Sequence, residues 1–270
     1  MSIRVVAKVD LRETGRSWRL LGLGAAYVFF FTGAAAIFVS LGQLPGVVPV
    51  SPGFTGALVH PLGLLFPVVG ILLGYRTIIG ERVSGTIRLL LSLPHARVDL
   101  VVGKLTSRIV LVSTTATLGA MCGYLASALF EGSISGLEYA LVIALALVLQ
   151  ATFVAISVGL SAGIESETMV VATALGSVLL FAVLWQGVVQ TLVSLVSAMG
   201  ASAIAEPFTV ILNAVNPVLA FSRLASLVLG TGGQVSSPWH EWVVPALVLL
   251  SWLVLPVLLG VKRFEGAEIS

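Results

Sequence analysis

The sequence predicts an all-α integral membrane protein with six transmembrane helices in a single domain, residues 1–270. Two observations lead to this fold class. Of the 270 residues, 58% are hydrophobic and only 10% are charged, whereas roughly 25% of the residues in an average soluble domain are charged. A water-soluble chain could not bury that much apolar surface in one core, but a bilayer solvates it. The second observation is that the apolar residues form stretches long enough to cross a membrane.

Residues 1–19 predict an amphipathic helix that lies along the cytoplasmic surface of the membrane. Basic residues at positions 4, 8, 12, 16 and 19 are mixed with Val5, Val6, Val9, Leu11 and Trp18. A helix with this pattern places its apolar side chains among the lipid headgroups and keeps its charges in water. The alternative is a frayed leader whose charges only help to orient the first span.

Six stretches meet the requirement of about 20 apolar residues for a transmembrane helix. Five of them are residues 20–41, 104–130, 139–162, 169–192 and 242–261. The sixth, residues 56–75, follows the first span and is apolar apart from His60. Pro61 and Pro67 predict a kink in this helix.

Residues 193–241, which precede the last span, contain apolar stretches interrupted by polar residues. Glu206, Asn213, the pair Asn216-Pro217 and Arg223 interrupt them. We therefore expect helices that are external or re-entrant, dipping part of the way into the membrane and returning.

The basic residues orient the chain. With six spans, 13 of the 14 Lys and Arg lie on one side: before the first span, between the second and third spans, and after the last span. The positive-inside rule makes that side the cytoplasm, so both termini are expected there. A seventh span within residues 193–241 would move Lys262 and Arg263 to the outside, which disfavours it.

Few ionisable groups lie at membrane depth, where an ion-coupled carrier or a membrane enzyme usually keeps them. Within the spans we find Arg108, near a cytoplasmic end, and His60, near an outer end. His95 and His240 are expected on opposite sides, and Cys122 is the single cysteine, so no metal site is predicted. The sequence contains no Gly-x-x-x-x-Gly-Lys-Ser/Thr motif, so the chain itself is expected to bind neither ATP nor another cofactor.

The segment Gly159-Leu160-Ser161-Ala162-Gly163 matches the Gly-x-Ser-x-Gly pattern of nucleophilic serines. An intramembrane serine hydrolase built on Ser161 would need a histidine at similar depth, and on that side only His95 is expected. Small residues at helical spacing also allow close packing of helices in membranes, and we prefer this interpretation here and for Gly70-x-x-x-Gly74. A secondary carrier or channel is the other alternative, although no paired repeat with broken helices is evident.

The loop at residues 76–104, between the second and third spans, contains the most informative motif. It includes Gly80-Glu81-Arg82-Val83-Ser84-Gly85-Thr86-Ile87-Arg88-Leu89-Leu90-Leu91-Ser92-Leu93-Pro94. Ser84 is expected to cap a short helix that begins after it, and Pro94 to end that helix. Ile87, Leu90 and Leu91 would share one face, which needs either a partner protein or the lipid headgroups.

This loop resembles the coupling region of type-2 ABC exporter permeases, the ABC-2 type. The motif is Glu81-x-x-Ser84-Gly85-Thr86-Ile87-Arg88-x-Leu90-Leu91-x-x-Pro94, followed by Arg97, Asp99 and Gly103-Lys104. The six-span layout, Asn216-Pro217 and the ending Lys262-Arg263-Phe264-Glu265 are also similar to this family, particularly to its archaeal members and the permease linked to nitrous oxide reductase maturation.

The resemblance implies a non-catalytic permease whose short cytoplasmic coupling helix docks on a separate ATP-binding subunit. That partner would bind ATP and Mg, and two permease copies, expected to be a homodimer, would complete the transporter in the cell membrane. Transport is expected to be export, of a substrate that the sequence does not identify. The implied coupling residues are Glu81, Arg82, Ser84, Gly85, Thr86, Ile87, Arg88, Leu90, Leu91 and Pro94.

Overall fold

A computed structural model describes residues 6–8, 10–11, 17–42, 53–85, 97–131, 134–231 and 238–266, and all regular structure within these ranges is helical. Six helical segments in the described part of the chain are long and apolar enough to cross a membrane. They are α2 (Trp18–Gly42), α3 (Gly53–Gly74), α6 (Arg97–Glu131), α7 (Gly136–Gly163), the continuous run α8 (Glu167–Val178), η1 (Leu179–Leu184) and α9 (Trp185–Ala198), and α12 (Trp239–Gly266). The predicted all-α fold with six spans is confirmed.

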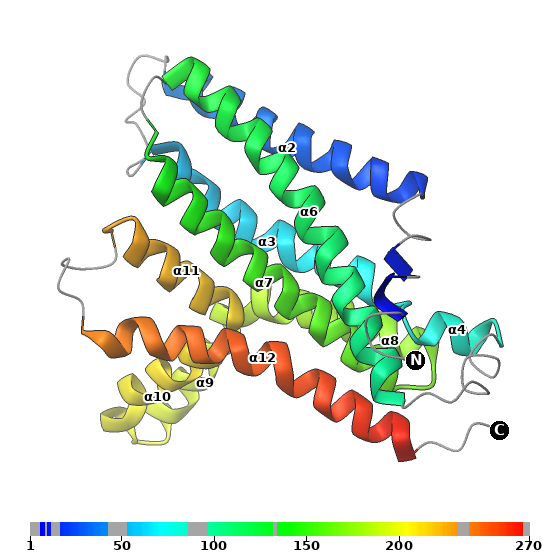
Figure 1. Cartoon of the computed structure of the whole chain (residues 1–270). Coiled ribbons are helices and arrows are strands. Elements are labelled where there is room, and N and C mark those ends of the chain that lie inside the picture. The colour runs from blue at the N-terminus through cyan, green and yellow to red at the C-terminus, as the bar shows by residue number, and fades with distance from the viewer. Residues whose placement is uncertain are drawn as a thin grey trace.

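Helix α7 forms the centre of the bundle and is its most buried span (Figure 1). It packs against α3, α6, α8 and α12, and against the shorter helix α11 (Pro217–Val228). Aromatic side chains fill the core beside it, and the rings of Tyr27 and Phe66 meet edge to face with centroids 5.6 Å apart. Two neighbouring spans, α2 and α6, pack mainly on each other.

Glycines set the closest helix contacts in the bundle. A Cβ on Gly260 of α12 would collide with the backbone oxygen of Gly159 on α7, and a Cβ on Gly70 of α3 would lie 2.9 Å from the backbone oxygen of Gln150. Adding one to Gly74 would strike the Ser157 hydroxyl. Small residues at these positions let backbones touch, so the packing interpretation of both glycine motifs is confirmed.

A further glycine pair, not singled out in the sequence, joins α2 to α6. Cβ atoms added to Gly119 and Gly123 would each lie 2.6 Å from a Cβ of α2, that of Tyr27 and that of Phe31 respectively. The spacing of four residues, Gly119-x-x-x-Gly123, is the signal from which this contact could have been predicted.

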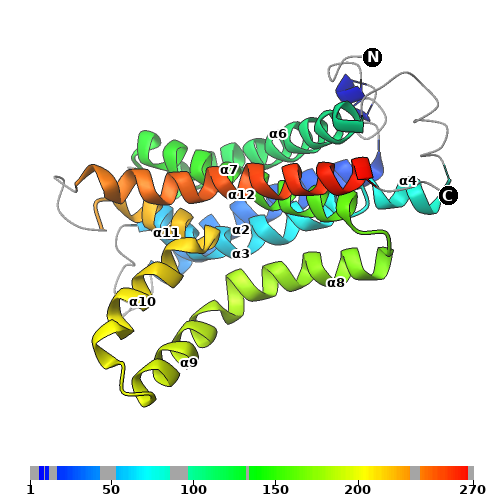
Figure 2. The same cartoon turned by 90° about the horizontal axis from the view of Figure 1, so that it is seen from below.

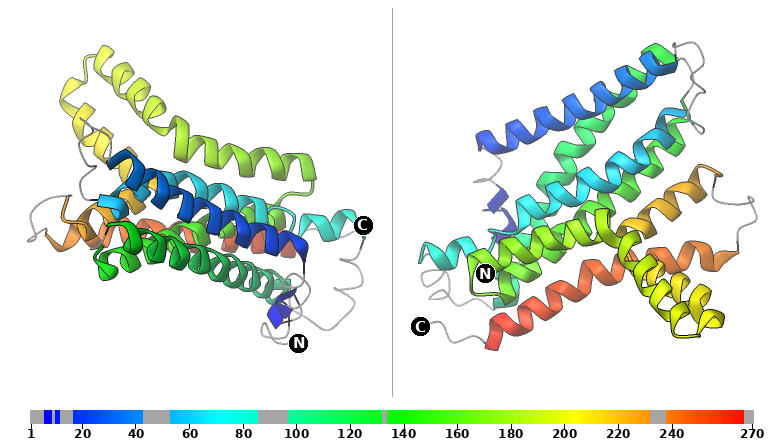
Figure 3. Two further views of the ribbon diagram at one scale, coloured as in Figure 1. Left: turned by 90° about the horizontal axis from the view of Figure 1, so that it is seen from above. Right: turned by 180° about the vertical axis from the view of Figure 1, so that it is seen from behind.

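The fifth span lies along one side of the bundle and continues past the predicted end at residue 192, to Ala198 (Figures 2 and 3). Its middle section, η1, is a π-helix. A π-helical turn replaces i→i+4 hydrogen bonds by i→i+5 bonds and so leaves a backbone carbonyl available. Most of the large apolar side chains of this span are exposed on the bundle surface, including Leu175, Val183 and Leu195.

Residues 202–228 form a re-entrant pair of helices. Helix α10 (Ser202–Val215) meets α11 at a bend of 91°, with a break at Asn216. The start of α10 and the end of α11 both lie at the end of the bundle opposite the end of α12 (Figure 1). A bent pair of helices thus precedes the last span, and the first residues of the segment predicted as external or re-entrant, 193–198, belong to α9.

Side chains satisfy the backbone groups that this break exposes. Asn216 accepts hydrogen bonds from the backbone N–H groups of Val218 and Leu219 through Oδ1, at 2.8 and 3.2 Å, and so caps α11. Its Nδ2 donates to the backbone oxygen of Phe181, within the π-helix, at 2.9 Å. Trp252 Nε1 donates to the oxygen of Val215, the last residue of α10, at 2.9 Å. These bonds allow irregular backbone in a membrane protein, where unsatisfied polar groups are costly.

Other helix boundaries differ from the predicted spans. Helix α6 begins at Arg97 rather than at residue 104, and α12 spans residues 239–266 rather than 242–261. Near the N-terminus, residues 6–8 and 10–11 are helical and α2 begins at Trp18. The predicted interfacial helix over residues 1–19 lies partly outside the described residues and stays a prediction.

Candidate functional site

The candidate site surrounds α4 (Ile79–Val83), a five-residue helix joined to the end of α3 by the turn at residues 75–78. It lies at the end of the bundle that also holds the end of α12 (Figure 1). Four of the predicted coupling residues fall in or next to it: Glu81, Arg82, Ser84 and Gly85. The other six lie outside the described residues, and these are Thr86, Ile87, Arg88, Leu90, Leu91 and Pro94.

Ser84 ends α4, and the short helix predicted to begin after it lies outside the described residues, so its capping by Ser84 stays a prediction. Its backbone has helical angles and its N–H donates to the oxygen of Gly80 at 3.1 Å. Gly85 follows with φ of 77°, a left-handed conformation that glycine adopts without steric cost and that commonly terminates helices. The Gly85 N–H donates to the oxygen of Arg82, also at 3.1 Å. The sequence analysis did not anticipate that a helix precedes this pair.

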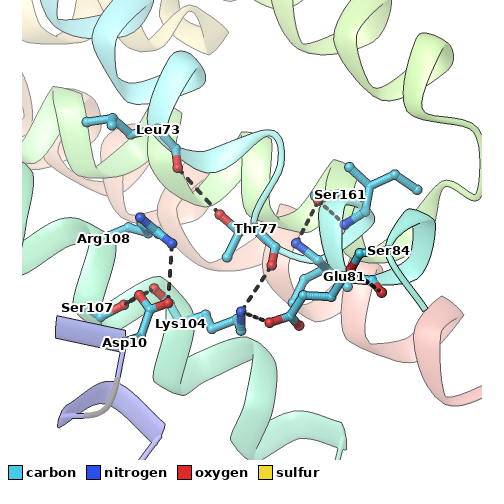
Figure 4. Close-up of polar contacts among 11 residues, drawn as sticks. Asp10, Leu73, Thr77, Glu81, Ser84, Lys104, Ser107, Arg108 and Ser161 are labelled. Carbon is cyan, nitrogen blue, oxygen red and sulfur yellow. Dashed lines mark hydrogen bonds and ion pairs between the residues drawn. The ribbon is translucent and has the colours of Figure 1, made fainter. Parts of the chain in front are cut away.

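The start of α4 is held by a serine from another helix. Ser161, near the end of α7, is fully buried, and its Oγ accepts hydrogen bonds from the backbone N–H groups of Ile78 and Ile79 at 3.1 and 2.9 Å (Figure 4). Isoleucine has no polar side chain with which to cap a helix, and Ser161 supplies the missing acceptor. The serine of the Gly-x-Ser-x-Gly motif therefore has a structural role at this position.

An ion pair ties the middle of α4 to α6. Lys104 Nζ donates to Glu81 Oε1 and also to the backbone oxygen of Thr77, the latter at 3.3 Å (Figure 4). The side chains are 9% and 22% exposed for Lys104 and Glu81, so the pair is largely shielded from water. Glu81 Oε2 is buried and has no hydrogen-bond partner among the described residues.

Arg82 extends from α4 to two further spans. Its Nη2 donates to the backbone oxygen of Ala162 on α7 at 3.2 Å. Its guanidinium carbon lies 5.0 Å from the centre of the Phe264 ring on α12, within the range of a cation–π interaction. Helix α4 is therefore connected to α6, α7 and α12 at once.

A second polar cluster joins the N-terminal segment to α6, beside the first. Asp10, which is buried, accepts hydrogen bonds from the Ser107 hydroxyl and from Arg108 Nη2, the latter at 3.2 Å (Figure 4). The sequence analysis did not identify Asp10. An acidic residue within a basic helix was the available signal, because a buried carboxylate needs a cationic partner.

An exposed ion pair lies next to α4. Arg76 Nε is 3.1 Å from Glu167 Oε1, which connects the turn after α3 to the first turn of α8. The side chains are 57% and 35% exposed for Arg76 and Glu167, so water screens the pair and it contributes only about 0–1 kcal/mol. In addition to α6, α7 and α12, the α4 region is thus linked to α8, the first part of the fifth span.

The outward surface of α4 differs from its anchored side. Glu81 and Arg82 point toward the bundle through the contacts above, whereas Val83 is 62% exposed and Ser84 and Gly85 are also exposed. Of the predicted coupling residues that the structure describes, two therefore hold α4 on the bundle and two lie on its accessible surface.

The described residues contain no group of three or more His, Cys, Asp or Glu that could hold a metal ion. His60 and His240 lie near the starts of α3 and α12, at the end of the bundle opposite α4 (Figure 1), and His95 lies outside the described residues. Among the described residues, the chemistry available around α4 is that of ion pairs, capping and packing.

The fold defines a multi-pass membrane protein, and comparison with known proteins specifies its family. A family model described as "ABC-2 family transporter protein" matches residues 4–269. The chain therefore belongs to the ABC-2 family of transporter proteins, as its motifs suggested. Over 137 residues it is 26% identical to "Probable ABC transporter permease protein NosY" of Stutzerimonas stutzeri. That match covers 51% of this chain and 48% of the relative, so the chain aligns with about half of the relative's length.

Proposed function

We propose that this chain is the permease subunit of an ABC exporter in the cell membrane, with both termini in the cytoplasm and a separate ATP-binding subunit docked below α4. The family and the NosY relative support the transporter class. The observation that carries the coupling proposal is the attachment of α4 to three spans, through Lys104 on α6, Ser161 on α7 and Phe264 on α12.

In this proposal α4 and the residues after it transmit the ATPase movement to the membrane. Closure of the ATPase displaces the docked segment, and the attached spans move with it as rigid bodies. The permease then needs no catalytic group, cofactor or metal of its own, because the partner binds ATP and Mg. The predicted coupling residues that the structure does not describe, from Thr86 to Pro94, would supply the rest of the contact.

A polar face on α9 supports a second copy of the chain as the other wall of the pathway. Gln186, Gln190, Ser194 and Ser197 are exposed and, at spacings of three and four residues, share one side of the helix. Neither glutamine makes a hydrogen bond within the described residues, whereas Ser194 donates to the backbone oxygen of Thr191 at 2.8 Å. Unsatisfied amides facing lipid are costly, so this face fits a homodimer interface or an aqueous pathway between two copies.

The test is co-purification of the tagged protein from its native membrane in mild detergent, with partners identified by mass spectrometry. We expect an ATP-binding subunit at roughly equal stoichiometry. Val83→Asp places a charge on the accessible surface of α4 and should release that subunit. Thr231→Asp, a change at an exposed position at the opposite end of the bundle, is the control and should retain it. Purification of the wild-type chain alone in several detergents would refute the proposal.

A serine hydrolase built on Ser161 gains no support from the site. The side chain is fully buried and its oxygen accepts two backbone hydrogen bonds, which is the environment of a helix cap. A nucleophile requires access to substrate and a positioned base.

A further inference from the structure

A cleft of about 500 Å³ lies between the re-entrant helices α10 and α11 and the first turns of α12. Its α11 residues come from the first two turns of that helix, and its α12 residues from the first two turns of α12, which begins at the end of the bundle opposite α4 (Figure 1). One wall is apolar and includes Val210, Leu219 and Val244. Val210 and Val244 are also exposed on the bundle surface, so the cleft opens toward the surrounding membrane.

An unsatisfied amide faces this cleft. Asn213 lines it, and its Oδ1 is buried and accepts no hydrogen bond from the described residues. By contrast Thr209, one turn earlier on α10, already donates to the backbone oxygen of Ala205 at 2.8 Å. A buried amide oxygen without a partner costs about 1–3 kcal/mol. A ligand that brings a hydrogen-bond donor to Asn213 would remove that cost.

The polar wall of the cleft carries one charge of each sign. Arg223 of α11 and Glu241 of α12 form an ion pair with Nη2 and Oε2 2.8 Å apart, and both line the cleft. A carboxylate offers about four lone-pair sites, so Glu241 can accept from a further donor while it is paired with Arg223. The wall is therefore electrically balanced, which favours a headgroup that also carries both signs.

We propose that this cleft binds a zwitterionic phospholipid of the outer leaflet. Its ammonium group would lie against Glu241 and the Asn213 amide oxygen, its phosphate would lie toward Arg223, and one acyl chain would follow the apolar wall of α10 and α12. The neighbouring Trp239 and Trp242 at the start of α12 are side chains typical of the membrane interface, the depth of a lipid headgroup. The choice of leaflet rests on the orientation in the proposed function, whereas the contacts use only residues at the opposite end of the bundle from α4.

The test measures lipid retention by the purified full chain in non-ionic detergent, counted by native mass spectrometry. The probes are phosphatidylethanolamine, phosphatidylglycerol and diacylglycerol with identical acyl chains, so that they differ only in the headgroup. We expect preferential retention of phosphatidylethanolamine by the wild-type chain. Asn213→Leu should weaken its binding about five- to tenfold, through loss of one hydrogen bond. Glu241→Gln should weaken it about tenfold, through loss of a charge-assisted contact.

The matched control is Glu206→Gln, which removes a carboxylate on the same helix as Asn213 but outside the cleft. It should leave phosphatidylethanolamine binding unchanged. Equal retention of the three lipids by the wild-type chain would overturn the proposal. So would unchanged phosphatidylethanolamine binding in both Asn213→Leu and Glu241→Gln, and either result would mean that the cleft holds only water or an unselected acyl chain.

Discussion

At the scale of single residues, two polar side chains from spans hold a helix that has few stabilising features of its own. Helix α4 is five residues long, too short to be stable in isolation. Ser161 provides the cap that its own sequence lacks, and Lys104 pairs with its carboxylate. Ser161 and Lys104 both belong to other helices, α7 and α6, so α4 is stabilised mainly by tertiary contacts.

Replacing Ser161 by Ala should destabilise the start of α4. The change leaves the buried N–H groups of Ile78 and Ile79 without an acceptor, which costs about 1–3 kcal/mol. Hydrogen exchange of these two amides should accelerate accordingly. Ser194→Ala is the control, because that hydroxyl is exposed and bonds only within its own helix. Unchanged exchange at positions 78 and 79 would show that Ser161 does not hold α4.

Substitutions of Glu81 and Lys104 should have strongly non-additive effects on the free energy of unfolding. Glu81→Gln leaves the shielded Lys104 ammonium uncompensated, and Lys104→Met does the same to the carboxylate. Each should cost about 1–3 kcal/mol, below the about 3–5 kcal/mol of a fully buried pair, since Glu81 retains some exposure. The double variant should lose less stability than the two single losses together. Additive losses, measured by unfolding in detergent, would mean that the two side chains do not interact.

At the scale of elements, close backbone contacts and side-chain donors allow irregular helices to pack. The α10–α11 break is tolerated because Asn216 serves it twice, as a cap for α11 and as a donor to the π-helix of the neighbouring span. The π-helix and the break are joined directly, since Asn216 at the break donates to the Phe181 carbonyl of the π-helix. Where α7 crosses α12, Gly159 and Gly260 let the two backbones come into direct contact.

Gly260→Ala should destabilise the protein although alanine is the better helix former. Helix propensity favours the change by about 1 kcal/mol, but the new methyl group would collide with the backbone oxygen of Gly159 and force α7 and α12 apart. Gly176→Ala on α8 is the matched control, because no atom lies within 4 Å of its added Cβ. It should be neutral or stabilising. A stability of Gly260→Ala equal to that of Gly176→Ala, in detergent unfolding, would contradict the close packing.

At the scale of the whole molecule, the arrangement has two ends with different properties. The α4 end concentrates ion pairs and connects the N-terminal segment, α4, α6, α7 and α12. The other end holds the re-entrant helices and the cleft that contains the Arg223–Glu241 pair. This division fits the proposed function, in which an ATPase on one side of the membrane is coupled to a pathway through it.

Cysteine labelling should place the two ends on opposite sides of the membrane. In a Cys122→Ala background, Ser84→Cys and Thr231→Cys each introduce a thiol at an exposed position at one end. A membrane-impermeant maleimide added to intact cells should label only position 231, and in inside-out vesicles only position 84. Labelling of both positions from the same side would refute the six-span orientation.

Much of the fold was predictable from local patterns, and most of the candidate site was not. Apolar length is enough to locate a span, because each helix satisfies its backbone groups within itself. The small-residue motifs at Gly70 and Gly159 indicated close packing in the same local way. The role of Lys104 required knowledge of which carboxylate it would meet, 23 residues away in the chain. Helix α4, which Ser84 ends, was not predicted, because it depends on contacts with other helices and not on a local pattern.

The sequence by itself determined the membrane class, the number of long apolar spans and the family resemblance, and its charges predict the orientation of the spans. These properties depend on composition and on spacing along the chain, because the thickness of the bilayer sets the length of a span and the basic residues favour one side. Only the tertiary structure decided that Ser161 is a cap, that Asp10 pairs with Arg108, and that Asn213 faces a cleft beside Arg223 and Glu241. Each of these depends on two or more helices meeting at a particular register, and no local pattern of residues specifies that register.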